Sequence, residues 1–165
     1  MEPFEVFPLK VTESLALLTI IGIPDQESTT TTLYDYLHRN GITTVFLTEG
    51  SDCHGVRNIA MAFGEDLLKG IESELEALRI VLQAKAVIVE KPVALVRILG
   101  PHFDIRPGVA GRLFGKLAKA GIKVLAASTT ITTSLLVVPE DKAEQVIRAL
   151  ESIFKVPRSR QGHEA

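Results

Sequence analysis

The chain has 165 residues, of which 46% are hydrophobic and 23% charged, and these values suit one large soluble domain or two small ones sharing a core. Its net charge of −2 is not the excess of positive charge typical of proteins that bind nucleic acid. No apolar run approaches the roughly 20 residues needed to cross a bilayer. No secretory leader is recognised, and the single cysteine, Cys53, excludes an internal disulfide and fits a reducing compartment. We therefore expect a cytoplasmic globular protein that binds neither nucleic acid nor a membrane.

The first half of the chain predicts strands alternating with helices. Apolar, β-branched runs predict strands at 15–22, 42–49, 56–63 and 84–89, and helical periodicity predicts helices at about 28–40 and 65–80. The second of these helices has an expected buried stripe of Leu67, Leu68, Ile71, Leu75 and Leu78. Lys91 and Pro92 are then expected to turn the chain into its second half.

The second half predicts the same order about 80 residues later. Strands are expected at 93–99, 122–128 and 131–138. One helix has Pro107 in its first turn and Gly121 as its stop, and a last helix opens at Pro139 and Glu140. Val109, Leu113 and Leu117, with Ala110 and Phe114 beside them, mark the buried face of the first helix. The last helix has an apolar face of Ala143, Val146, Ile147, Leu150 and Phe154.

This strand–helix–strand–strand–helix order predicts an α+β fold built from two ferredoxin-like βαββαβ units, whose antiparallel sheets carry helices on one face. The first unit is expected at 13–91, and the second at 92–156 together with an N-terminal strand at 4–11. The second unit needs that strand because the polar segment after Phe154 holds no convincing strand, so the two units are expected to be intertwined. Pro8 makes the added strand an edge strand or a bulged one. Residues 157–165 are expected to form a flexible polar tail.

Two segments resemble a known family. GPHFDIRPGVAGRLFGKLAKAGIKVL (100–125) and the hairpin STTITTS (128–134) are similar to the second of the paired ACT domains in the regulatory region of aspartate kinase. The resemblance covers nearly the whole chain, and an intertwined N-terminal strand is also a feature of that family. The chain shows no Gly-rich phosphate loop, so the kinase domain is expected to be absent.

The resemblance implies a non-catalytic regulatory protein that senses an amino acid, of lysine or threonine type, at an ACT–ACT interface. It implies a homodimer formed by ACT–ACT packing, an amino-acid biosynthetic enzyme as a further candidate partner, and no cofactor other than the effector. In the first unit it places the effector loop in IPDQESTTTT, where Glu27 and Ser28 replace the family's Pro-Gly pair. The candidate ligand-binding residues there are Asp25, Gln26, Ser28, Thr29, Thr30 and, by alignment with a glutamine of the family, Thr48.

The chemistry of this loop suits an amino acid. The Asp25 carboxylate could accept an ammonium group, and the N–H groups that begin the helix could bind a carboxylate. The alternative is that Asp25 or Ser28 only caps the helix. In the second unit the resemblance points to Lys123 and Val124, which would offer backbone groups to an effector across a dimer interface, whereas the alternative makes Lys123 an exposed strand charge.

No catalytic or metal-binding constellation is expected. The four histidines, His38, His54, His102 and His163, lack metal-ligand spacing, and the sequence SDCHG around His54 is interpreted as a turn. Asp104 and Arg106 could pair with each other or with a ligand, and of the two a surface ion pair is expected. Two functions remain open, an amino-acid sensor and a ligand-free structural dimerisation and docking module with the ACT fold. A small enzyme of ferredoxin-like fold would need a catalytic constellation that the sequence does not show.

Overall fold

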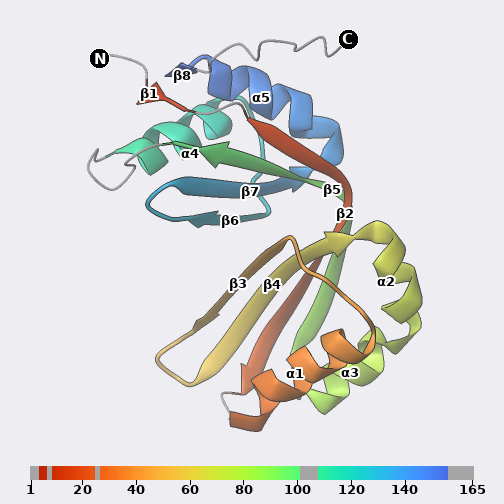
Figure 1. Cartoon of the computed structure of the whole chain (residues 1–165). Helices are drawn as coiled ribbons and strands as arrows, with labels where there is room; N and C mark the ends of the chain where they lie inside the picture. The colour runs from red at the N-terminus through yellow and green to blue at the C-terminus, as the bar shows by residue number, and fades with distance from the viewer. Residues whose placement is uncertain (1–3, 7–8, 25–26, 101–107, 156–165) are drawn as a thin grey trace. The chain divides into compact units, whose positions relative to one another are not determined.

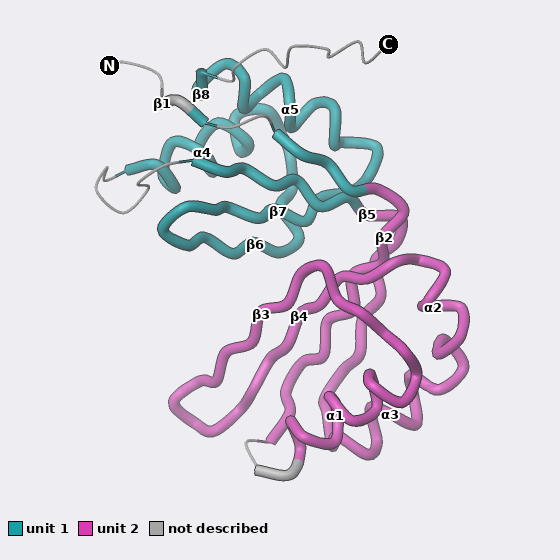
Figure 2. Tube along the Cα trace, in the orientation of Figure 1, with its two compact units in different colours: residues 1–12, 94–165 teal, residues 13–93 magenta. Residues whose placement is uncertain are grey.

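The computed structural model of the chain describes residues 4–6, 9–24, 27–100 and 108–155 (Figure 1). It divides into two compact units, coloured separately in Figure 2: unit 1 is Met1–Thr12 with Ala94–Ala165, and unit 2 is Glu13–Val93. The two longest strands, β2 (Lys10–Pro24) and β5 (Ala86–Leu99), each belong partly to both units. The predicted α+β class, with antiparallel strands and packed helices, is confirmed.

Unit 2 is an antiparallel sheet with its helices on one face (Figure 1). Its strands follow the order β3 (Phe46–Ser51), β4 (Val56–Gly64), β2 and β5. β4 pairs antiparallel with both neighbours, so that Ala62 lies opposite Leu17 of β2 and Phe46 of β3. The helical elements are α1 (Glu27–Arg39), α2 (Glu65–Ile71), the 3₁₀ turn η1 (Glu72–Glu74) and α3 (Leu75–Val81).

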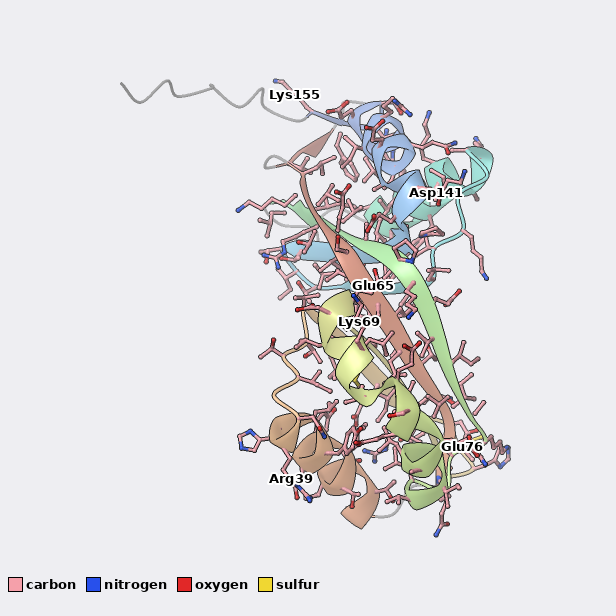
Figure 3. The ribbon with its side chains drawn as sticks, turned by 90° about the vertical axis from the view of Figure 1, so that its right-hand side faces the viewer. Arg39, Glu65, Lys69, Glu76, Asp141 and Lys155 are labelled. Atoms are coloured by element: carbon pink, nitrogen blue, oxygen red, sulfur yellow. The ribbon has the colours of Figure 1, made fainter. Side chains whose placement is uncertain are left out.

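The core of unit 2 joins these helices to the sheet. Its buried members are Ala16, Leu18, Ile20, Ile23, Leu33, Leu37, Ile42, Ile59, Met61, Phe63, Leu68, Ile71, Leu78, Leu82 and Ala84. The predicted stripe is confirmed, since three of its five leucine and isoleucine residues are in this core and the other two pack against it. The single helix predicted at 65–80 is instead interrupted by η1. Gly70, which lies just before this interruption, is a poor helix former. Exposed charges, including Lys69 and Glu76, occupy the outer side of α2 and α3 (Figure 3).

A bulge in β2 accommodates Gly22. The pairing of β2 with β4 shifts register between Ile20 and Ile23, and Gly22 has a φ of 75°. The Gly22 N–H donates to Asn58 Oδ1 at 2.9 Å, and the N–H of Lys85 donates to the carbonyl of Ile21 at 2.8 Å. The N–H of Gly22 is therefore bonded by a side chain, and the carbonyl of the neighbouring Ile21 bonds Lys85, just before β5.

Helix α1 ends in a Schellman motif at Gly41, which has a φ of 64°. The N–H of Ile42 donates to the carbonyl of Leu37 at 2.9 Å, and that of Gly41 to the carbonyl of His38 at 3.0 Å. Ile42 is buried below the end of the helix rather than in a strand. For this reason the strand predicted from residue 42 begins only at Phe46.

Unit 1 has the strand order β5, β7 (Thr133–Pro139), β6 (Ala126–Thr129). Its helical elements are α4 (Val109–Lys119), η2 (Glu140–Lys142) and α5 (Ala143–Glu151). Its core contains Val6, Ala94, Val96, Ile98, Val109, Leu113, Leu117, Ile122, Leu136, Val138, Ala143, Val146, Ala149, Leu150 and Phe154. The apolar face predicted for the last helix is confirmed at Ala143, Val146 and Leu150, with Ile147 packed at the edge of this core. Phe154 is also buried, but it lies in a short strand beyond the end of α5, so its assignment to the helix was wrong.

The predicted face of α4 is confirmed at Val109, Leu113 and Leu117, which are buried, but the prediction was wrong for Ala110 and Phe114. Both are exposed because each lies one residue, or about 100° of helix rotation, beyond a buried position. The helix ends with a second Schellman motif: Ile122 donates to Leu117 and Gly121 to Ala118, each at 3.0 Å.

The N-terminal segment is not the single strand predicted at 4–11. Phe4–Glu5 forms β1, and Lys10 already begins β2. β1 pairs in parallel with β8 (Phe154–Lys155), a short strand after α5 that the sequence analysis did not expect, and the N–H of Val6 donates to the carbonyl of Lys155 at 3.1 Å. The polar composition after Phe154 hid this strand, because a two-residue pairing needs backbone groups and no apolar run. The tail predicted at 157–165 lies outside the described residues.

The turn predicted at Lys91 and Pro92 is also wrong, because β5 runs through both residues without interruption. Proline removes a backbone donor and fixes φ near −65°, a value compatible with an extended chain. The β-branched residues on both sides of the pair favour that extended chain.

Candidate functional site

The first-unit candidate residues lie where β2 ends at Pro24 and α1 begins at Glu27. Asp25 and Gln26 are outside the described residues, and of Ser28 only the helical backbone is described. Thr29 and Thr30 are half-buried in the first turn of α1. The first turn of this helix is therefore the described part of the predicted loop.

The side chain of Arg57, at the start of β4, reaches this first turn. Arg57 Nη1 donates to Thr30 Oγ1 at 2.5 Å and to Glu49 Oε1 of β3 at 3.0 Å. The other carboxylate oxygen of Glu49 accepts a 3.0 Å hydrogen bond from the hydroxyl of Tyr34, one helical turn after Thr30. We call Thr30, Tyr34, Glu49 and Arg57 the α1–β3 network. The sequence analysis missed it, since Thr30 and Arg57 are 27 residues apart and belong to no recognised spacing.

The electrostatics of the network favour a neutral Tyr34 hydroxyl. The side chain of Arg57 is only 19% exposed and that of Glu49 33%, so their ion pair is partly shielded from water. Burial raises the pKa of Tyr34, and the hydrogen bond to Glu49 and its negative charge raise it further, while the charge of Arg57 acts in the opposite direction. The Tyr34 hydroxyl is therefore a stable donor at neutral pH.

Thr48 is not part of this network. It is half-buried on β3 opposite Ala60, whereas the next residue, Glu49, lies opposite Ile59. Side chains alternate between the two faces of a strand, and Ile59 belongs to the core under the helices. Glu49 thus projects on the helix side of the sheet and Thr48 on the other side, away from Thr30.

The second-unit candidates precede β6, which begins at Ala126 rather than at the predicted residue 122. Lys123 is exposed, and Val124 is half-buried against the core of unit 1. The N–H of Leu125 donates to the carbonyl of Val137 at 2.8 Å, which fixes the chain just after them. Of the neighbouring loop, Asp104, Arg106 and Pro107 lie outside the described residues, and Gly108 at the N-terminus of α4 has a φ of 90°.

The turn predicted around His54 is confirmed. Asp52 Oδ1 accepts hydrogen bonds from the N–H groups of His54 at 2.8 Å and Val56 at 3.0 Å, an arrangement that closes the β3–β4 hairpin. Over the described parts of the chain, no three His, Cys, Asp or Glu side chains gather as they would around a metal ion. None of the helices there is long and apolar enough to cross a membrane.

Comparison with known proteins identifies the class of fold. Residues 88–152 match the model of the ACT domain family. Among curated proteins the chain is similar to aspartokinase of Bacillus sp. (strain MGA3), at 25% identity over 147 residues, and to aspartokinase of Thermus thermophilus, at 27%. These matches cover 89% and 87% of the chain but only 36% of each relative, so the chain spans about a third of their length.

Solved structures show the same likeness. The ligand-free regulatory subunit of aspartate kinase from Thermus thermophilus superposes with a TM-score of 0.77 at 21% identity, covering 93% of this chain and 99% of that one. The regulatory subunit from Thermus flavus gives a TM-score of 0.79 at 22% identity, with 90% and 98% covered. The chain therefore has an ACT-like fold. The resemblance to the regulatory region of aspartate kinase, predicted from the sequence, is confirmed.

Proposed function

We propose that this chain is a non-catalytic regulatory protein of the aspartate kinase type that senses an amino acid, of lysine or threonine type, through paired ACT units. The observation that carries the proposal is the coverage of the structural matches. The chain covers 99% of the regulatory subunit from Thermus thermophilus, but only 36% of whole aspartokinases. An amino-acid biosynthetic enzyme in the cytoplasm is the corresponding regulated partner.

The tandem arrangement is supported by a repeated structural detail. Both first helices of the proposed units end in a Schellman motif, at Gly41 and Gly121, and these glycines are 80 residues apart (121 − 41). A glycine with positive φ followed by a buried isoleucine closes each helix, at Ile42 and Ile122. Two copies of one βαββαβ unit would produce this agreement, although the family model matches only residues 88–152.

Homodimerisation through ACT–ACT packing is supported by the two ends of the strand order. Among the described strands, β3 in unit 2 and β6 in unit 1 each pair with one neighbour only. Exposed strand edges invite pairing with another chain, and a closed symmetric dimer would cover them. Lys123 and Val124, just before β6, would then lie at such an edge.

Calorimetry of the full chain against a panel of amino acids tests the sensor proposal. We expect lysine, threonine or a related amino acid to bind at up to millimolar concentration. Asp25→Ala should weaken that binding with little effect on folding, whereas Asp35→Ala, a matched change at an exposed position of α1, should leave it unchanged. Absence of binding by every amino acid would sink the sensor proposal.

One observation favours the alternative, a ligand-free dimerisation and docking module. The hydroxyl of Thr30 already accepts a hydrogen bond from Arg57, so an effector that needed this group would have to compete with the protein itself. Sedimentation of the full chain over a range of concentrations, with and without amino acids, separates the two. If the chain dimerises, no amino acid changes the dimer affinity and calorimetry detects no binding, the chain is the docking module.

A further inference from the structure

We propose that the Arg57–Glu49 ion pair couples the first turn of α1 to the edge strand β3, and so transmits the state of the effector loop to that edge. The inference rests on the proposed function only for the assignment of this turn to an effector loop. Its structural part concerns residues that are all described, on one helix and two adjacent strands. Arg57 acts here as a positioning residue, because its side chain bonds Thr30 of α1 and Glu49 of β3.

Geometry makes the pair the connection between helix and strand. A single atom, Arg57 Nη1, donates to Thr30 on α1 and to Glu49 on β3. If either acceptor moves, the Arg57 guanidinium group shifts with it, and its hydrogen bond to the other acceptor changes. Glu49 and Arg57 lie on neighbouring strands, since Glu49 is opposite Ile59 and Arg57 is opposite Ser51. Tyr34 adds a second link from the same helix to the same carboxylate.

Position in the sheet gives the coupling a consequence. β3 ends the strand order of unit 2, so among the described strands β4 alone holds it in the sheet. The last three residues of β3, Glu49–Ser51, are exposed. A strand held from one side depends more on side-chain contacts to remain in place than a central strand does. An effector that bonds the Thr30 hydroxyl in place of Arg57 would therefore change how firmly β3 is held at the edge of the sheet.

Amide hydrogen exchange of the full chain tests the coupling without any ligand. Thr30→Val removes the hydroxyl with little change of shape. It should speed exchange in β3, to which Thr30 is linked through Arg57, by about fivefold or more, the lower end of typical coupling between sites. Thr31→Val makes the same chemical change one residue later, on an exposed side chain that belongs neither to the candidate ligand-binding residues nor to the α1–β3 network, and should leave β3 exchange unchanged. Equal β3 exchange in the two variants would overturn the proposal.

A double-mutant cycle separates coupling from general loosening. In an Arg57→Met background, Thr30→Val should have no further effect on β3, because the connection is already cut. Arg148→Met, which removes an exposed ion pair on α5 of unit 1, serves as the control background and should preserve the effect of Thr30→Val. Additive effects of Thr30→Val and Arg57→Met would show that the two residues act on β3 independently, and would also overturn the proposal.

The effector arm of the experiment distinguishes this inference from the proposed function. An amino acid found to bind in calorimetry should change β3 exchange in the wild-type chain and leave it unchanged in Arg57→Met. Binding without any change in β3 would reject the coupling and leave the sensor function standing. If no amino acid binds, the sensor function fails, and the exchange results for Thr30→Val still decide whether helix and strand are coupled.

Discussion

The hydroxyl of Tyr36 on α1 donates a 2.8 Å hydrogen bond to Glu74 of η1, 38 residues later in the chain. It ties the helix to a different part of unit 2 from Tyr34, which bonds Glu49 of β3. Burial, followed by the hydrogen bond and the charge of Glu74, raises the pKa of Tyr36 from 10.0 to about 12. The two tyrosines of the chain thus anchor α1 to two different elements through the same phenol–carboxylate chemistry.

Stability should fall in alkaline solution through Tyr36. The folded pKa lies above the unfolded one, so the contribution of the neutral phenol is fully present below about pH 10 and is lost as the pH rises toward 12. The difference in free energy of unfolding between the wild type and Tyr36→Phe should be constant below pH 10 and shrink above it. A difference that stays constant up to pH 12 would contradict the assignment.

The titration itself can be observed directly. The chain contains two tyrosines and no tryptophan, so tyrosinate absorbance reports Tyr34 and Tyr36 alone. Tyr36→Phe should remove the step at the higher pH and leave that of Tyr34, whose pKa is also raised. If the remaining tyrosine titrates near 10.0, Tyr34 is not held by Glu49 as the structure shows.

Gly22→Ala should destabilise the chain by about 2–4 kcal/mol, through a left-handed backbone and an overpacked contact together. Gly22 has a φ of 75°, and a Cβ there would lie 2.6 Å from side-chain carbons of Lys85. Gly41→Ala isolates the backbone cost, because Gly41 has a φ of 64° but no atom within 4 Å of the added Cβ, and should lose about 1–2 kcal/mol. Denaturant unfolding measures both, and equal losses would remove the steric part of the argument.

Leu113→Ala and Phe114→Ala test the corrected face of α4. Leu113 is 1% exposed in the core of unit 1 and should cost about 2–5 kcal/mol when truncated. Phe114 is 38% exposed and should cost less than about 1 kcal/mol, although it is the larger side chain. Thermal unfolding of the two variants compares them, and a Phe114 cost as large as that of Leu113 would restore the face predicted from the sequence.

Local patterns in the sequence were sufficient to predict most elements. The spacing of Val109, Leu113 and Leu117, with Gly121 as the stop, predicted α4, and the repeat about 80 residues apart predicted an equivalent α1. Errors arose where tertiary contacts decide. Ile42 is β-branched, as strand residues often are, yet it is buried in the core at the end of α1. For this reason β3 begins at Phe46, later than the apolar run that starts at Ile42.

The candidate site was less accessible to sequence reasoning. Thr30 was chosen through the family resemblance, but its partner Arg57 was not, because a donor on a distant strand leaves no trace in local spacing. The valine–arginine–asparagine run at 56–58 carried the only available signal: two polar side chains at the start of an otherwise apolar strand. Both bond to the region where β2 gives way to α1, Asn58 at Gly22 and Arg57 at Thr30.

Val6→Ala should destabilise unit 1 although it lies far from the rest of that unit in sequence. Val6 is 2% exposed in the core that includes Phe154, and residues 1–12 group with residues 94–165. Removing two methyl groups from this core should cost about 1–2 kcal/mol. Val11→Ala is the matched control, since Val11 is 38% exposed and should change little. Hydrogen exchange of the full chain should show α5 losing protection in Val6→Ala before α2 and α3 do. Equal loss of protection in both units, or no loss in either, would show that the N-terminal segment does not stabilise the unit 1 core.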